Sequence, residues 1–170
     1  MKSLSENIWF QHFPLRIMGM KLGRTTTVIR LESGRTIIHS TGPFEGIHIS
    51  SIKDLGDPGW LVEATNFHDT FAKAGRESFP DLPYLVPDGF PGADDLRAIP
   101  LEAPPEWVGE VEVIPLRGMP KINEHFLLHR PSRTLIVADL VFNLPPETDW
   151  WTRNLLGLLS GMKKYPGNSR

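Results

Sequence analysis

The sequence predicts an α/β sandwich, and three observations support this. First, residues 25–32 and 35–40 alternate, are rich in β-branched side chains and flank Ser33-Gly34, which is the pattern of a β-hairpin. Second, apolar strand-like segments alternate with segments that carry apolar residues at helical spacing. Third, another hairpin is expected over 124–140, with "RPSR" at its tip. Strands mixed with helices in this order indicate sheets covered by helices.

The remaining elements are predicted from local patterns. Strands are expected at 60–65, 84–87 and 110–116, and helices at 48–56, 69–79 and 147–164. Gly56 is expected to close the first helix, and Thr148 or Asp149 to cap the last. Seven prolines fall between Pro80 and Pro105, so 80–105 is expected to be an irregular excursion, either a flap over a site or a surface connection.

Composition narrows the class of protein. The chain has 170 residues, so we expect residues 1–170 to form one domain that is large enough to bury a core. A net charge of −2 gives no basis for nucleic-acid binding, and 81–112 contains eight Asp or Glu against Arg97 alone. There are no cysteines, which excludes disulfides and thiolate ligands. No signal peptide and no run of ~20 apolar residues is found, so a soluble, cytoplasmic protein without membrane association is expected.

Familiar catalytic signatures such as the P-loop or the H-E-x-x-H motif are absent, and single polar residues at strand ends remain. Asp139 follows four apolar residues and needs a metal, an arginine or backbone amides as its partner once buried. His68 is either a metal ligand or a polar residue hydrogen-bonded at a helix start, and Asp69 suits the first helical turn. His39 is expected to be a hydrogen-bonded structural histidine, and His129 a surface residue near the hairpin tip.

The order of the segments "TIIHSTGP", "TNFHDTF" and "TLIVADLVF" resembles the metallo-β-lactamase superfamily over roughly residues 8–145. The phrases "TTVIRLESGRTIIHS", "FHDTF…FPDLPYLVPDGF" and "HRPSRTLIVADLVFN" are similar to an uncharacterised bacterial domain-of-unknown-function family within it. The resemblance implies a four-layer αββα sandwich with a metal site at one edge, here lacking the last strand and helix.

The resemblance also implies where metal ligands would lie. Active members carry T-H-x-H-x-D-H, and this chain keeps Thr65 and His68 but has Asn66, Thr70 and Phe71 at the other positions. Asp139 matches the bridging aspartate of the superfamily. The expected ligands are therefore His68 and Asp139, with Asp69 and His125 as further candidates, and Asn123 and Glu124 are the polar residues nearest to a missing histidine.

Two functions follow as hypotheses. Because zinc hydrolases use three protein ligands, the two matching positions favour a domain with a degenerate metal motif, non-classical or non-catalytic, that binds a small molecule or a partner. The alternative is a mononuclear hydrolase of an ester, amide or phosphoester, in which His68 and Asp139 hold one Zn, Fe or Mn ion. Trp150 and Trp151 either pack the last helix on the sheet or form an exposed patch for a homo-oligomer.

Overall fold

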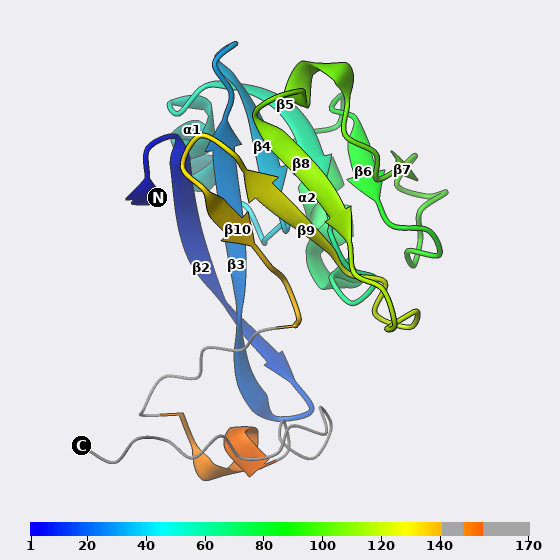
Figure 1. The fold of residues 1–170 in the computed structure, drawn as a ribbon. Helices are drawn as coiled ribbons and strands as arrows, with labels where there is room; N and C mark the ends of the chain where they lie inside the picture. The colour runs from blue at the N-terminus through cyan, green and yellow to red at the C-terminus, as the bar shows by residue number, and fades with distance from the viewer. Residues whose placement is uncertain (141–147, 155–170) are drawn as a thin grey trace, which may run out of the picture.

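The computed structural model describes residues 1–140 and 148–154 (Figure 1). Its larger sheet has seven strands in sequence order: β1 (Lys2–Ser5), β2 (Ile8–Ile17), β3 (Met20–Arg30), β4 (Arg35–His39), β5 (Asp57–Val62), β6 (Tyr84–Val86) and β7 (Ile99–Pro100). Strands β1 to β4 are antiparallel neighbours, whereas β4 to β7 are parallel. The smaller sheet is antiparallel and contains β8 (Val111–Pro115), β9 (His125–His129) and β10 (Thr134–Ile136).

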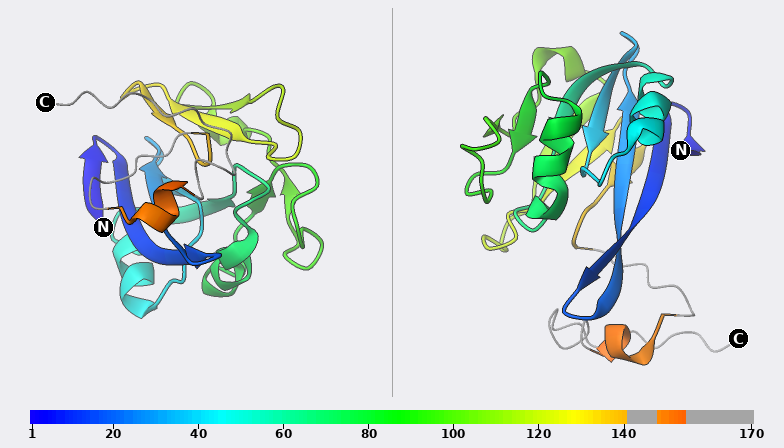
Figure 2. Two further views of the ribbon diagram at one scale, coloured as in Figure 1. Left: turned by 90° about the horizontal axis from the view of Figure 1, so that it is seen from below. Right: turned by 180° about the vertical axis from the view of Figure 1, so that it is seen from behind.

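Alternation along the central strands divides their side chains between two cores. Ile37 of β4 and Val62 of β5 face the smaller sheet and pack with Leu127 of β9. Their neighbours Ile38 and Leu61 point to the opposite face, where α1 (Gly46–Lys53) and α2 (Ala72–Ser78) cover them. Figure 2 shows both helices on the outer side of the larger sheet. The central strands are therefore buried on both faces, as parallel strands usually are.

Three of the four expected layers lie in the described residues: the helices, the larger sheet and the smaller sheet. The helical turn at 150–154 lies at the far end of the β2–β3 hairpin (Figure 1), where Thr152 accepts a hydrogen bond from the backbone N–H of Lys21. Asp149 caps this turn through the N–H of Thr152, as one of the two predicted caps. Most of the predicted helix 147–164 lies outside the described residues, as do all positions from 155 onward.

Most elements agree with the predictions. The two predicted hairpins form as β3–β4 and β9–β10, and the helix expected at 69–79 divides into η1 (Asp69–Phe71) and α2. Strands β1 and β2 were not predicted, because the segment before residue 25 lacks a clean alternation and contains Pro14. Gly56 does not end α1, which stops at Lys53; a Cβ at Gly56 would lie 2.5 Å from the carbonyl oxygen of Gly34.

The proline-rich excursion packs onto the molecule as a connection. Phe90 and Leu96 are buried in the core beneath the helices, and Leu101 joins the core between the sheets. It contains β7 and a 3-10 turn, η2 (Pro105–Trp107), which buries Trp107. Trp150 and Trp151 are exposed, but the indole N–H of Trp151 donates a hydrogen bond to the carbonyl of Met18 in the β2–β3 turn, so one of the two rings contacts the hairpin of the larger sheet. No helix among the described residues is long and apolar enough to cross a membrane.

Candidate functional site

Polar side chains gather where β4 and β5 end. We call Arg24, Ser40, Glu63, Thr65, His68 and Asp139 the His68 cluster. Ser40 directly follows β4, and Glu63 and Thr65 follow β5. Because adjacent parallel strands end at the same edge of a sheet, their next residues are brought together without any sequence motif. Chain segments far apart in sequence then add Arg24 and Asp139.

His68 lies between two carboxylates. Its Nδ1 is 3.6 Å from Oε2 of Glu63, and its Nε2 is 3.4 Å from Oδ1 of Asp139. The Nδ1 atom is also within 3.0 Å of the Ser40 hydroxyl. His68 and Asp139 were expected as ligands of one metal ion; the structure brings their side chains into direct contact, and it adds Glu63, which was not predicted. Each ring nitrogen therefore faces a carboxylate, which favours the imidazolium, and Nδ1 also meets the Ser40 hydroxyl, which can donate or accept.

The pKa shifts agree with this arrangement. Burial by itself lowers the pKa of His68, but the contacts with Asp139 and Glu63 outweigh burial and raise it. Burial alone would raise the pKa of each carboxyl, yet the close contact with His68 holds the pKa of Glu63 and of Asp139 below their usual range. Each shift has the sign of an ion pair in which the imidazole is positive and both carboxyls are negative.

A second cation enters the His68 cluster from β3. Arg24 is buried, and its Nη1 donates to Oγ of Ser40 at 3.0 Å. Burial lowers the pKa of Arg24, while Glu63 and Asp139 oppose that effect. An arginine side chain stays protonated in proteins, so the cluster contains two cations, Arg24 and His68, opposite the two carboxylates. This charge balance is supplied entirely by the chain.

Ser40 is held in an unusual backbone conformation. Its φ is +61°, in the left-handed region that a serine rarely adopts. The N–H of Ser40 donates to the carbonyl of Val62, and its carbonyl accepts from the hydroxyl of Thr26 at 2.6 Å. These bonds turn the chain sharply at the end of β4, so that the hydroxyl of Ser40 points between Arg24 and His68.

Glu63 anchors the cluster from the helix-covered face of the sheet. Its Oε1 accepts hydrogen bonds from the N–H and hydroxyl of Thr41 and from the hydroxyl of Tyr84 at 2.9 Å. Burial followed by the negative charge of Glu63 raises the pKa of Tyr84, so this phenol stays a donor. The α2 helix closes over Thr41, because a Cβ at Gly75 would lie 2.5 Å from its methyl group. One carboxylate oxygen of Glu63 is thus fully committed to structure.

Asp139 is positioned from both sides. Its Oδ2 accepts from the hydroxyl of Thr65 at 2.9 Å, and Thr65 is the threonine that the superfamily motif keeps. Oε1 of the buried Glu124 accepts from the N–H of Ala138 at 2.8 Å, which holds the chain just before Asp139. Glu124 therefore positions the strand end and does not take the place of the missing histidine. Its companion Asn123 binds the carbonyl of Asp88.

Two further candidates do not join the cluster. Asp69 is exposed at the first position of η1, in agreement with the helix-start interpretation. His125 lies 3.1 Å from the carbonyl of Asn123 through its Nδ1 and lines a groove beside β8. Within residues 1–140 and 148–154 neither side chain contacts His68 or Asp139, so the structure does not place them as additional ligands of that pair.

Two other histidines differ from expectation. His129 is buried and not on the surface: its Nδ1 lies 2.7 Å from the Ser132 hydroxyl in the hairpin turn. His39 is buried as a structural residue, but neither ring nitrogen has a hydrogen-bond partner among the described residues. Burial lowers the pKa of His39 to about 4, so its ring is neutral at pH 7. His129 was predicted to be exposed because it lies next to the hairpin turn, and its burial could not be seen from that position.

The donor set does not fit a zinc site with three protein ligands. The 3.4 Å between His68 and Asp139 is a spacing that two ligands of one ion can have, because ligand bonds are near 2 Å. Glu63, however, faces the opposite nitrogen of the same ring, so the three groups do not converge on one point. In the described residues no group of three or more His, Asp or Glu side chains is arranged to hold a metal ion.

Ser40, His68 and Asp139 are connected in the order of a catalytic triad, but here a second carboxylate, Glu63, faces the same imidazole nitrogen as Ser40. A serine nucleophile requires an imidazole that can accept its proton. His68 has a raised pKa and faces acceptors with both nitrogens. Ser40 is 1% exposed and already accepts from Arg24, so a substrate would have to displace neighbouring groups to reach it. The cluster is suited to holding charge in place.

Sequence-based reasoning missed Glu63 and Arg24, and it noted Ser40 only as a residue that, with His39, replaces an aspartate of the superfamily. A signal existed for Glu63, which is a carboxylate inside the apolar strand segment "WLVEAT" and needs a buried partner for the same reason as Asp139. No comparable signal exists for Arg24 or Ser40. Their roles depend on the pairing of β3 with β4 and on the left-handed turn after β4.

Comparison with known proteins identifies the fold. No family model matches the chain, and no curated protein matches it. Among solved structures, DIM-1 metallo-β-lactamase superposes with a TM-score of 0.61 at 16% identity, over 86% of this chain and 72% of that chain. TMB-1 gives 0.57 at 10% identity over 86% and 72%, and a metallo-β-lactamase from Pontibacter korlensis gives 0.54 at 10% over 93% and 84%.

These identities are too low to indicate more than the fold, and they do not test the predicted relationship to an uncharacterised bacterial family. The larger sheet, its two covering helices and the smaller sheet facing it place this chain in the metallo-β-lactamase-like fold.

Proposed function

We propose that this domain is a metallo-β-lactamase-like protein that works without a metal centre and serves as a binding module. The observation that carries the proposal is the position of His68 between Glu63 and Asp139. Two carboxylates at the strand ends would ordinarily repel each other or attract a cation. Here His68 and Arg24 provide the positive charge from within the chain.

The energetics of burial support this proposal. A buried charge is tolerated only when it is paired and hydrogen-bonded. For His68 to bind a metal ion, one ring nitrogen would have to lose its proton and its contact with a carboxylate. Arg24 would then remain beside the ion, where two like charges repel each other. Ligand exchange would therefore replace internal ion pairs that already satisfy the cluster.

The alternative hypothesis is the mononuclear hydrolase, and the same experiment distinguishes the two. Protein purified without an affinity tag is subjected to metal analysis, with His68→Ala as the test variant and His12→Ala, which removes an exposed histidine, as the control. We expect less than about a tenth of an equivalent of zinc, iron or manganese in all three proteins, because three ligands are required. Chelator should leave the melting temperature unchanged.

Activity assays complete the test. We expect no hydrolysis of generic phosphoesters, esters or thioesters, and no labelling of Ser40 by a fluorophosphonate, because the hydroxyl is buried and the neighbouring imidazole is held between two carboxylates. One equivalent of metal in the unaltered protein and in His12→Ala, lost in His68→Ala, would establish the hydrolase hypothesis. Labelling of Ser40 that depends on His68 would contradict the proposal through a different, metal-free chemistry.

A further inference from the structure

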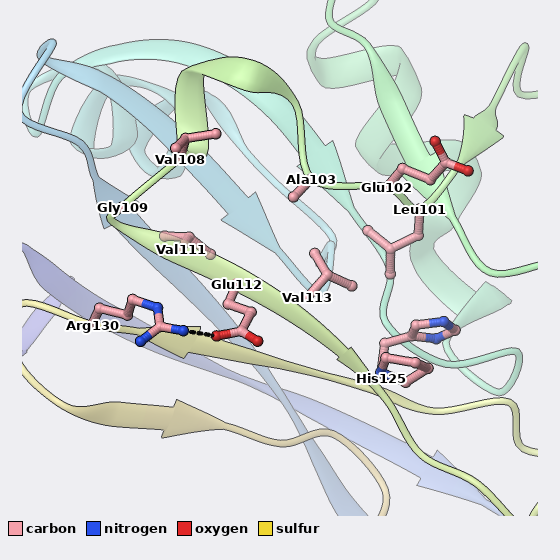
Figure 3. A pocket seen from close by; sticks show the side chains of 11 residues that line it. Leu101, Glu102, Ala103, Val108, Gly109, Val111, Glu112, Val113, His125 and Arg130 are labelled. Atoms are coloured by element: carbon pink, nitrogen blue, oxygen red, sulfur yellow. Dashed lines mark hydrogen bonds and ion pairs between the residues drawn. The ribbon is translucent and has the colours of Figure 1, made fainter.

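The two sheets of the sandwich leave an open groove along β8. Figure 3 shows it between β8 and the segment 101–103 that follows β7. It has a volume of about 460 Å³, and we call it the β8 groove. Its walls are mainly apolar and include Leu101, Val108, Val111 and Val113. Val108 is 81% exposed, which is unusual for a valine and shows that the apolar wall is open to solvent.

The free edge of β8 faces away from β9. Strand β8 pairs only with β9 among the described strands, and it is the last strand of its sheet. The flanking hydrogen bonds, Arg130 N–H to Glu110 and Leu116 N–H to Glu124, fix which residues face β9. By alternation the backbone groups of Val111 and Val113 point outward. An unpaired edge of this kind is a template for an added strand.

The charge next to the groove is negative. A second hollow of about 130 Å³ shares Leu101, Glu102 and His125 with the β8 groove and is also lined by Asp88. The carboxylates of Asp88 and Glu102 form no hydrogen bond or ion pair with any residue that the structure describes. By contrast, Glu112, which lines the β8 groove itself, is paired with Arg130 of the same lining (Figure 3). The second hollow therefore offers two unpaired carboxylates to a cation.

We propose that the β8 groove binds an extended peptide that adds a strand to β8. The peptide places an apolar side chain in the groove and, two residues away, a lysine or arginine between Asp88 and Glu102. Residues i and i+2 of a strand point to the same face and lie about 7 Å apart, which suits two hollows that share three lining residues. This inference rests on the binding role proposed above and specifies the partner.

The probe is the blocked peptide Ac-STVTKTVS-NH2, in which a valine lies two positions from the lysine on either side, so that both strand directions are tested. Backbone amide signals are followed by NMR during titration and hydrogen exchange. We expect saturable binding, with new protection of the Val111 and Val113 amides, since these N–H groups are unpaired in the free protein. Replacing the lysine of the peptide by glutamate should abolish binding.

Variants of the domain locate the interaction. Glu102→Lys should weaken binding by at least about tenfold, because it reverses the charge beside the peptide lysine. Asp95→Lys makes the same charge change at an exposed residue that lines neither hollow, and should change affinity by less than about twofold. Both substitutions are on the surface, so both proteins should fold, and the amide spectra verify this.

Several outcomes would overturn the inference. These are the absence of saturation at ~1 mM peptide, equal affinity for the lysine and glutamate peptides, or an equal effect of the two charge reversals. Protection of β8 that rises with protein concentration and needs no peptide would identify a second copy as the occupant instead. None of these outcomes depends on metal content, so failure of the peptide proposal is distinguishable from failure of the metal-free proposal.

Discussion

The His68 cluster and the β8 groove both contain carboxylates, but their surroundings differ. In the cluster, Glu63 is buried and Asp139 is partly buried, and each faces a cation and at least one hydroxyl donor. In the groove region, Asp88 and Glu102 are exposed, and their carboxylates have no partner in the described part of the chain. A buried charge must be paired for the protein to fold, whereas an exposed one can remain available to a ligand. We therefore expect the cluster to contribute to stability, and the unpaired carboxylates beside the groove to remain available to the proposed peptide.

The largest expected difference between the two regions appears when one carboxylate is removed from each. Glu63→Ala should reduce the free energy of unfolding by about 3–5 kcal/mol, because it leaves the buried Arg24 and the largely buried His68 with half of their negative charge. Glu102→Ala should change it by no more than about 0.5 kcal/mol. Urea denaturation measures both values.

Glu63→Gln is the matched control for that comparison. It keeps the shape of the side chain and one oxygen acceptor for Thr41 and Tyr84 but removes the charge. The loss of unfolding free energy in Glu63→Gln should lie between the losses in Glu63→Ala and Glu102→Ala. A loss for Glu63→Ala of less than about 1 kcal/mol would mean that the ion pairs do not stabilise the fold.

A smaller effect is expected from pH. His39 is buried with a pKa of about 4, against 6.5 when unfolded. Between these values only the unfolded state gains the proton, so stability should fall by about 3 kcal/mol as pH drops from 6.5 to about 4. His129, with a lowered pKa, acts in the same direction. The raised pKa of His68 gives stability that is already complete below 6.5, and Asp139 and Glu63, with lowered pKa values, lose theirs only below ~4.

The pH effect is assigned by substitution. In His39→Gln most of the fall between pH 6.5 and 4 should disappear, because glutamine takes up no proton. His12→Gln, at an exposed position, should keep the full slope. Chemical denaturation at several pH values measures both. An unchanged slope in His39→Gln would show that another titrating group causes the loss of stability. The burial of His39 would then not be its cause.

The smallest expected effect is at Thr65. Thr65→Val removes the hydrogen bond to Asp139 and should cost about 1 kcal/mol. Thr70→Val, at the exposed position where the superfamily motif has its aspartate, should cost a few tenths at most. Equal losses of unfolding free energy in the two variants would mean that Thr65 contributes only through its methyl group. Its hydrogen bond to Asp139 would then add no stability.

The sequence by itself determined the type of fold and the need of Asp139 for a partner. Alternation in 25–40, the second hairpin and the carboxylate after "TLIVA" placed β3, β4, β9 and β10 and indicated that Asp139 needs a partner. These conclusions depend on local periodicity and on the cost of burying an unpaired charge, both of which are legible in a short window.

Only the tertiary structure decided what that partner is. Sequence reasoning left a metal, an arginine or backbone amides open for Asp139; the fold provides His68, with Thr65 and Arg24 nearby. Strand register and the strained turn at Ser40 bring Arg24 and Glu63 together. Neither the register nor the turn can be predicted from a short stretch of sequence. Which charges are paired and which stay free depends on three-dimensional proximity and burial, and spacing along the chain does not encode these quantities.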